Sequence, residues 1–199
     1  MKFYLILVAL ANSLTLNSQI TASSCSQGLI FGFDGGSHIG SGFYNNQTGY
    51  DEITKESRFT CQFYFMDKIE NSHFEINSYY PNHKELGTIQ GTLEIISSTE
   101  FAIQLKEEHR GFVDFIHFSN EPVNFRIEKP KPWISIRCIY SDKTYFYKNS
   151  SDNLPIRSYV LKDDLICVDE IISNKAHDSF KGKKVTTGWI LPSDLNNIN

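Results

Sequence analysis

The chain has 199 residues, of which 40% are hydrophobic, 14% aromatic and 21% charged. This apolar content supports a buried core and excludes an intrinsically disordered or low-complexity protein. The 23 acidic residues outnumber the 19 basic ones, for a formal net charge of −4. We therefore expect neither a nucleic-acid partner nor attraction to acidic lipid surfaces, because both need a clustered basic excess.

The first 22 residues predict a cleaved secretory signal peptide. Lys2 supplies a positive start, residues 3–11 form a short apolar run, and small residues follow before Cys25. This order of charge, apolar run and small residues is typical of export signals, with cleavage expected after Ala22 or Ser24. Attachment of lipid to Cys25 is an alternative, although no Leu stands near the third position before it.

We expect the mature chain to be exported, with the periplasm as its location. No later window has the run of apolar residues that a transmembrane helix needs, so no membrane span is predicted. Loss of Lys2 removes one of the 19 basic residues, which leaves 18 against 23 acidic ones and a formal charge of −5.

The four cysteines, at positions 25, 61, 138 and 167, are expected to meet an oxidising compartment. We predict one disulfide that joins Cys25 or Cys61 to a later partner, with Cys138 as a candidate, whereas Cys167 is as readily a buried thiol as a bridge. The spacings do not match a zinc site, and no metal or other cofactor is predicted.

Alternation of apolar and polar residues dominates the chain from residue 58 onward. Such alternation is typical of half-buried strands, and short turn sequences separate the segments. The expected strands are residues 58–65, 73–80, 88–95, 101–105, 112–118 and 123–127. The sequence therefore predicts an all-β domain over residues 25–130, an antiparallel meander closed as a small barrel or folded as a sandwich.

Two segments flank this meander. The glycine-rich residues 28–42 lack the strand, spacing and helix of a phosphate-binding loop, so we interpret them as a turn and strand edge before the meander. Residues 128–132 contain two prolines, which disfavour a sheet ladder and predict a joint between domains. The strand expected at 133–140 suits either neighbour.

No catalytic constellation is visible in the sequence. The six histidines are scattered without ligand spacing, no Gly-x-Ser-x-Gly elbow is present, and the paired carboxylates stand at expected turns. We predict that the protein is not an enzyme and assign no catalytic residue, while an enzyme of unrecognised type stays as a minor alternative.

The C-terminal segment has the most specific pattern. Residues 143–147 read Lys-Thr-Tyr-Phe-Tyr, residues 159–164 read Tyr-Val-Leu-Lys-Asp-Asp, and residues 187–195 read Thr-Gly-Trp-Ile-Leu-Pro-Ser-Asp-Leu. This order resembles the bacterial SH3-like domain and implies a small SH3-like β-barrel over residues 133–199, with a short helical turn at Ser193. Residues 173–184 depart from the family, which usually has an aromatic strand there.

The resemblance implies a binding unit of the bacterial envelope that contacts peptidoglycan or peptide ligands. Tyr145, Tyr147 and Trp189 are the aromatic candidates for the ligand surface, and filling the barrel core is the alternative role for each. A second hypothesis is an immunity or inhibitor protein, whose acidic surface would steer it toward a basic hydrolase or toxin.

Overall fold

The structure, a computed structural model, describes residues 23–25, 28–55, 57–70, 72–81, 83–109, 117–172, 174–182 and 184–196. Within these ranges the regular structure is β-strand, apart from the 3₁₀ turns η2 (Lys84–Leu86) and η3 (Pro192–Asp194). The predicted all-β fold is confirmed. The expected signal segment and most of the strand expected at 112–118 lie outside the described residues.

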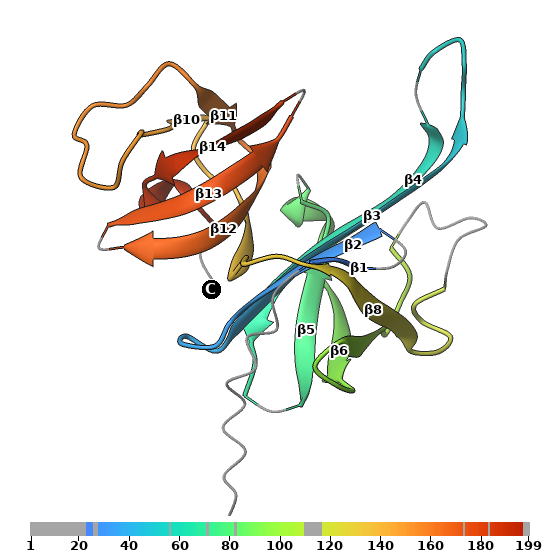
Figure 1. Cartoon of the computed structure of the whole chain (residues 1–199). Helices are drawn as coiled ribbons and strands as arrows, with labels where there is room; N and C mark the ends of the chain where they lie inside the picture. Colours follow the sequence, from blue (N-terminus) through green and yellow to red (C-terminus); the bar gives the residue numbers. More distant parts are fainter. Residues whose placement is uncertain are drawn as a thin grey trace, which may run out of the picture.

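The N-terminal part is a closed barrel in which every strand runs antiparallel to its neighbours (Figure 1). The short first strand pairs with both the second and the last, which closes the sheet. In chain order the strands are β1 (Ser23–Cys25), β2 (Leu29–Asp34), β3 (Ile39–Tyr50), β4 (Ser57–Lys68), β5 (His73–Tyr79), β6 (Ile89–Ile95), β7 (Glu100–Leu105) and β8 (Val123–Pro130).

The alternation pattern located most barrel strands, because β4 to β8 coincide with five of the predicted segments. The glycine-rich residues do contain a turn, at residues 35–38, but their interpretation as a strand edge was wrong, since β2 and β3 are full barrel strands. A Cβ on Gly40 would lie 2.1 Å from Ile69 Cδ1, and one on Gly42 would lie 2.5 Å from Phe65 Cζ. These glycines leave room for large neighbouring side chains. Because a glycine at such a position is not a hydrophobic residue, the sequence of these strands does not show the alternation of apolar and polar residues.

Aromatic side chains fill the barrel interior. Phe31, Tyr44, Phe63, Phe118 and Phe125 are buried there, with Tyr44 stacked on Phe63 at 5.2 Å between ring centroids. Each buried Phe or Tyr removes a large apolar surface from water, so this cluster is the main stabilising element of the barrel.

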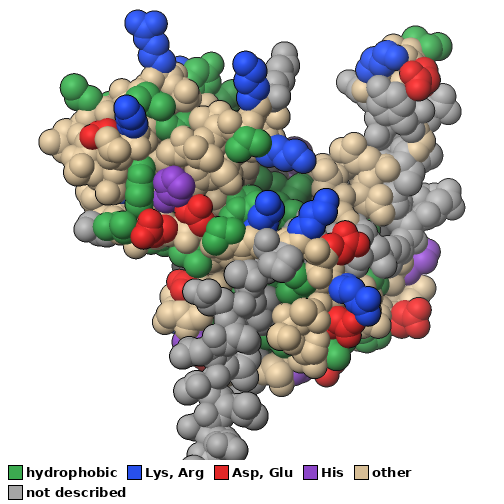
Figure 2. Space-filling view, viewed as in Figure 1, with side chains coloured by type: hydrophobic (Ala, Val, Ile, Leu, Met, Phe, Trp, Pro, Cys, Tyr) green, Lys and Arg blue, Asp and Glu red, His purple; other side chains and the backbone are tan. Residues whose placement is uncertain are grey.

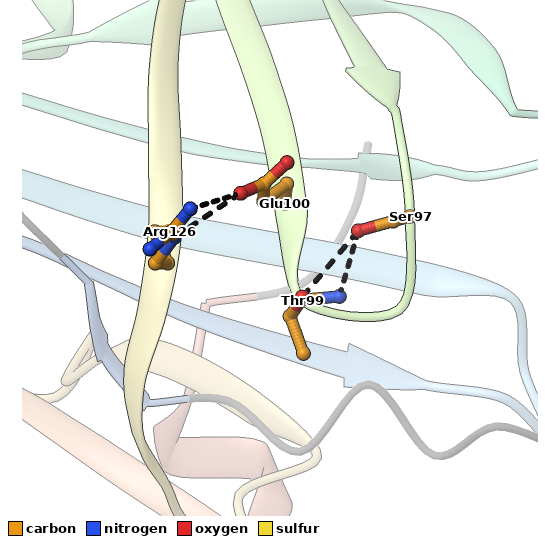
Figure 3. Close-up of polar contacts among 4 residues, drawn as sticks. All are labelled: Ser97, Thr99, Glu100 and Arg126. Carbon is orange, nitrogen blue, oxygen red and sulfur yellow. Dashed lines mark hydrogen bonds and ion pairs between the residues drawn. The ribbon is translucent and has the colours of Figure 1, made fainter.

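Outward-facing polar residues of the barrel pair across strands. Glu100 on β7 lies opposite Arg126 on β8, and Arg126 donates from Nε and Nη2 to Glu100 Oε1 at 3.1 and 2.8 Å (Figure 3). Ser97 Oγ accepts a hydrogen bond from the backbone N–H of Thr99 at 3.2 Å, which fixes the β6–β7 turn. Opposite charges facing one another in this way favour the observed register.

The C-terminal unit, residues 135–196, contains the remaining strands. A four-stranded sheet has the order β14-β13-β12-β9, and β10 pairs with β11 as a hairpin. Their bounds are β9 (Ser135–Cys138), β10 (Lys143–Tyr145), β11 (Tyr159–Leu161), β12 (Leu165–Ile172), β13 (Lys175–Lys181) and β14 (Val185–Ile190). Phe146, Val160, Ile166, Val168 and Ile190 are among the buried residues of this unit's core.

The two parts share a third apolar cluster. On β4, Phe63 and Phe65 point into the barrel while Tyr64 and Met66 point out, where they pack with Ile136 and Cys138 of β9. The strand expected at 133–140 thus pairs with β12 and also packs on the barrel. Beyond this cluster the β3–β4 hairpin projects from the barrel as a long arm (Figure 1).

None of the described residues forms a helix with the length and apolarity that crossing a membrane requires.

Candidate functional site

The outer face of the β10–β11 hairpin is unusually apolar for an exposed surface. Strand alternation buries Thr144 and Val160 and turns their neighbours outward. Tyr145 is 40% exposed, and its direct partner Tyr159 is 49% exposed. Other side chains fill the core of the unit, and these two rings face the solvent.

The two exposed rings form a pair with a cation on it. Tyr145 and Tyr159 have centroids 5.9 Å apart in a T-shaped arrangement. Lys143 Nζ lies 3.9 Å from the centroid of Tyr159 and 4.8 Å from that of Tyr145. A hydrogen bond with Tyr145 raises the pKa of the Lys143 ammonium above its ordinary value, so Lys143 is charged at neutral pH.

Tyr147 and Trp189 lie side by side although 42 positions separate them in the chain. The Tyr147 N–H donates to the Trp189 carbonyl at 2.6 Å, and the Trp189 N–H donates back at 2.9 Å. Both side chains are half-buried. The Lys175 ammonium lies 3.7 Å from the Tyr147 ring centroid and donates to the Asp152 carbonyl, so it holds the loop after β10 against β13.

The row of rings ends at a histidine paired with an aspartate. Trp189 lies opposite His177 of β13, with ring centroids 5.0 Å apart. His177 Nδ1 lies 2.6 Å from Asp169 Oδ1, and both side chains are about a third exposed, at 33% and 28%. Figure 2 shows histidine and acidic side chains adjoining over β12 and β13.

We name this surface the aromatic strip. It consists of Tyr159, Tyr145, Tyr147, Trp189 and His177. Of the three sequence-predicted aromatics, Tyr145 lies on β10, Trp189 lies on β14, and Tyr147 joins the two segments through its isolated bridge with Trp189. Sequence reasoning missed Tyr159 and His177 as members. The signal that could have found Tyr159 is the alternation of β11, in which Tyr159 and Leu161 face outward on either side of the buried Val160.

The predicted disulfide is not present among the described cysteines. Cys61, Cys138 and Cys167 are thiols. Cys61 points into the barrel and Cys138 packs outside it, so the wall of the barrel separates them. Burial raises the pKa of the Cys61 thiol well above its usual value and that of Cys167 to about 12, which makes both unreactive. The side chain of Cys25 lies outside the described residues.

The barrel interior contains a buried serine and histidine. Ser78 Oγ lies 2.8 Å from His109 Nε2, an arrangement that nucleophilic catalysis also uses. The Ser78 hydroxyl, however, donates to the Ile89 carbonyl at 3.0 Å, and the two side chains are only 0% and 2% exposed. The two side chains therefore serve as hydrogen-bond partners for one another inside the core, where a substrate cannot reach them.

No group of three or more His, Cys, Asp or Glu side chains is placed to hold a metal ion in the part of the chain that the structure describes. A cleft of about 290 Å³ lies between the barrel and the C-terminal unit, with Pro81 and Glu85 on one side and Tyr140 and Lys162 on the other.

Comparison of the chain with known protein families, curated proteins and solved structures found no match.

Proposed function

We propose that the chain is an exported, non-enzymatic binding protein of the bacterial envelope. Its SH3-like C-terminal unit contacts a cell-wall or peptide ligand through the aromatic strip. The observation that carries the proposal is the exposure of Tyr145 and Tyr159, at 40% and 49%, on a unit whose core is already filled. Aromatic faces left in water at one place are typical of binding surfaces.

The order of elements supports the SH3-like interpretation. A hairpin follows the first strand, three consecutive antiparallel strands follow the hairpin, and η3 comes after the closing strand. Residues after η3 return to the first strand, since Ile139 pairs with Leu195 and the Asn196 N–H donates to the Cys138 carbonyl. The end of the C-terminal unit thus returns to its first strand.

Sedimentation with purified peptidoglycan tests this proposal. We expect the mature protein to sediment with the polymer, and we expect Tyr159→Ala, Tyr147→Ala and Trp189→Ala to reduce the bound fraction. Tyr140→Ala is the matched control, because Tyr140 is 70% exposed and lies outside the strip. Each variant is first checked for an unchanged circular dichroism spectrum and thermal midpoint.

Peptidoglycan freed of its stem peptides separates the two ligand classes. Loss of binding to the stripped glycan assigns the strip to the peptide, and retained binding assigns it to the sugar chain. Sedimentation that is unchanged in all three strip variants contradicts the proposal.

A second candidate function rests on a different feature. The β3–β4 arm carries Ile53 near its tip, and this side chain is 92% exposed. A projecting hairpin with an apolar tip has a shape that fits the cleft of an enzyme, as an inhibitor or immunity protein requires. We expect Ile53→Asp to abolish inhibition of a co-purified hydrolase if this function holds, and to leave peptidoglycan sedimentation unchanged.

A further inference from the structure

The Tyr145–Tyr159 ring pair already accepts a cation from its own chain. Lys143 Nζ lies within 4.8 Å of both ring centroids, at the distances that attraction between an ammonium and an aromatic face requires. The backbone explains how this happens. Lys143 is two positions before Tyr145 on the same strand, so its side chain lies on the same outer face as the rings.

The Lys143 ammonium is bound weakly at this position. The Lys143 side chain is fully exposed, and no carboxylate forms an ion pair with it among the described residues. Its hydrogen bond with Tyr145 and its contacts with two exposed aromatic faces are all screened by water, so the ammonium gains little over a fully hydrated one. A second ammonium with better-placed contacts can therefore replace it.

We propose that the Tyr145–Tyr159 pair is the recognition site for a lysine-type side chain of a peptide ligand, and that Lys143 occupies the site until the ligand displaces it. This inference rests on the proposed binding role of the strip and names the group that its hairpin end receives. The net charge of −4 favours a cationic partner by attraction at long range.

The remaining strip fits an extended chain. From the hairpin the strip continues through Tyr147 to Trp189, whose backbones are joined by two hydrogen bonds. A peptide whose cationic side chain sits on Tyr159 can lay its following residues along these rings. Lys143 then acts as a competitor inside the site, which lowers affinity for weakly complementary ligands.

To test the inference, the full mature protein is titrated with Nα-acetyl-lysine N-methylamide. The NMR signals of the tyrosine rings are the readout. The norleucine analogue is the matched neutral probe, and N-acetylglucosamine and glucosamine distinguish an amino-sugar ligand. We expect the lysine probe to shift Tyr145 and Tyr159, with little effect of the norleucine probe at the same ionic strength.

Substitution of Lys143 tests whether its ammonium competes with the lysine probe for the two rings. We expect Lys143→Met to bind the lysine probe about two- to fivefold more tightly, the factor that corresponds to loss of one exposed ammonium–ring contact. Tyr159→Leu should weaken binding by a similar factor. Lys148→Met is the control, because Lys148 is an exposed lysine in the adjoining loop, and it should leave the dissociation constant unchanged.

Equal shifts with the lysine and norleucine probes, stronger shifts with glucosamine than with the lysine probe, or an unchanged dissociation constant in Lys143→Met would each overturn the inference. The proposed function has a separate readout. If peptidoglycan sedimentation still depends on Tyr147 and Trp189 while the lysine probe fails, the strip binds its ligand without a cation site.

Discussion

The phenolic hydroxyl of Tyr64 donates a hydrogen bond of 2.8 Å to the backbone carbonyl of Ile136, across the boundary between the barrel and the C-terminal unit. The backbone N–H of Ile136 donates to Ser41 Oγ at 2.7 Å. Ile136 lies on β9, the edge strand of the four-stranded sheet. The barrel therefore satisfies an edge that would otherwise offer free backbone groups to another strand.

Removal of this hydroxyl should weaken the junction. Tyr64 is fully buried, so Tyr64→Phe leaves the Ile136 carbonyl without its partner in an apolar environment. We expect a loss of about 1–3 kcal/mol in the free energy of unfolding, measured by urea denaturation. Tyr140→Phe, at a 70% exposed position, should change it by less than about 0.5 kcal/mol. Equal effects of the two variants would contradict this account of the junction.

The close approach of β2 to β9 gives an independent prediction. A Cβ on Gly32 would lie 2.7 Å from Ser135 Cα and 2.9 Å from Ser135 N, both of them backbone atoms that cannot rotate away. Gly32→Ala should therefore push β9 off the barrel and cost about 1–3 kcal/mol in thermal or urea unfolding. Gly35→Ala is the control, because its nearest neighbour would be the Phe33 ring at 3.7 Å. Wild-type stability in Gly32→Ala would show that the units are not packed together as described.

A buried carboxyl group should make the stability of the C-terminal unit depend on pH. Asp178 is 0% exposed, and neither of its carboxylate oxygens has a hydrogen-bond partner in the described structure. Burial, and secondarily the charge of Asp169, raises the pKa of Asp178 to about 8 from 3.8. The folded state therefore holds a proton that the unfolded state releases, and the free energy of unfolding falls as pH rises from about 4 to 8.

Asp178→Asn removes this titration. Relative to the wild type, we expect the variant to gain about 2–4 kcal/mol in unfolding free energy between pH 5 and pH 8, from roughly 1.4 kcal/mol per pKa unit. The comparison uses the change in unfolding free energy between the two pH values, because the new buried amide shifts the free energy of the variant by the same amount at pH 5 and at pH 8. Parallel stability curves for the two proteins would show that Asp178 is ionised or solvated in the folded state.

In contrast to the C-terminal unit, the barrel should lose stability as the pH becomes acidic. Burial lowers the pKa of His109 to about 4 from 6.5, against the opposing charge of Glu108. Between these values the unfolded state binds a proton that the folded state does not, so the free energy of unfolding falls as pH drops from 6.5 to 4. NMR titration of the imidazole signals should show His109 neutral down to about pH 4. A midpoint near 6.5 would place His109 in water.

The sequence predicts a strand correctly where apolar and polar residues alternate along it. It fails where glycines or long-range packing determine which residues are buried. Cys61, Phe63 and Phe65 show the alternation because they enter the barrel, but residues 63–66 are all buried because the C-terminal unit covers the other face. No local pattern reports that second contact. The glycines of β2 and β3 are similarly set by Phe65 and Ser135, residues far along the chain.

The candidate site was predictable in part for the same reason. Tyr145, Tyr147 and Trp189 stand out by residue type in a segment with a recognisable order. Their adjacency depends on the bridge between Tyr147 and Trp189, and the Tyr145–Tyr159 pair depends on the register of β10 with β11 across a long loop. Local sequence does not specify either pairing.

The most direct measurement is an amide chemical-shift map of the mature protein titrated with soluble peptidoglycan fragments. Our account predicts that the largest shifts fall on the strip, at Tyr145, Tyr147, Tyr159 and Trp189, and that they saturate with increasing ligand. Saturating shifts confined to the β3–β4 arm or to the cleft at Tyr140, or no shifts at all, would contradict it.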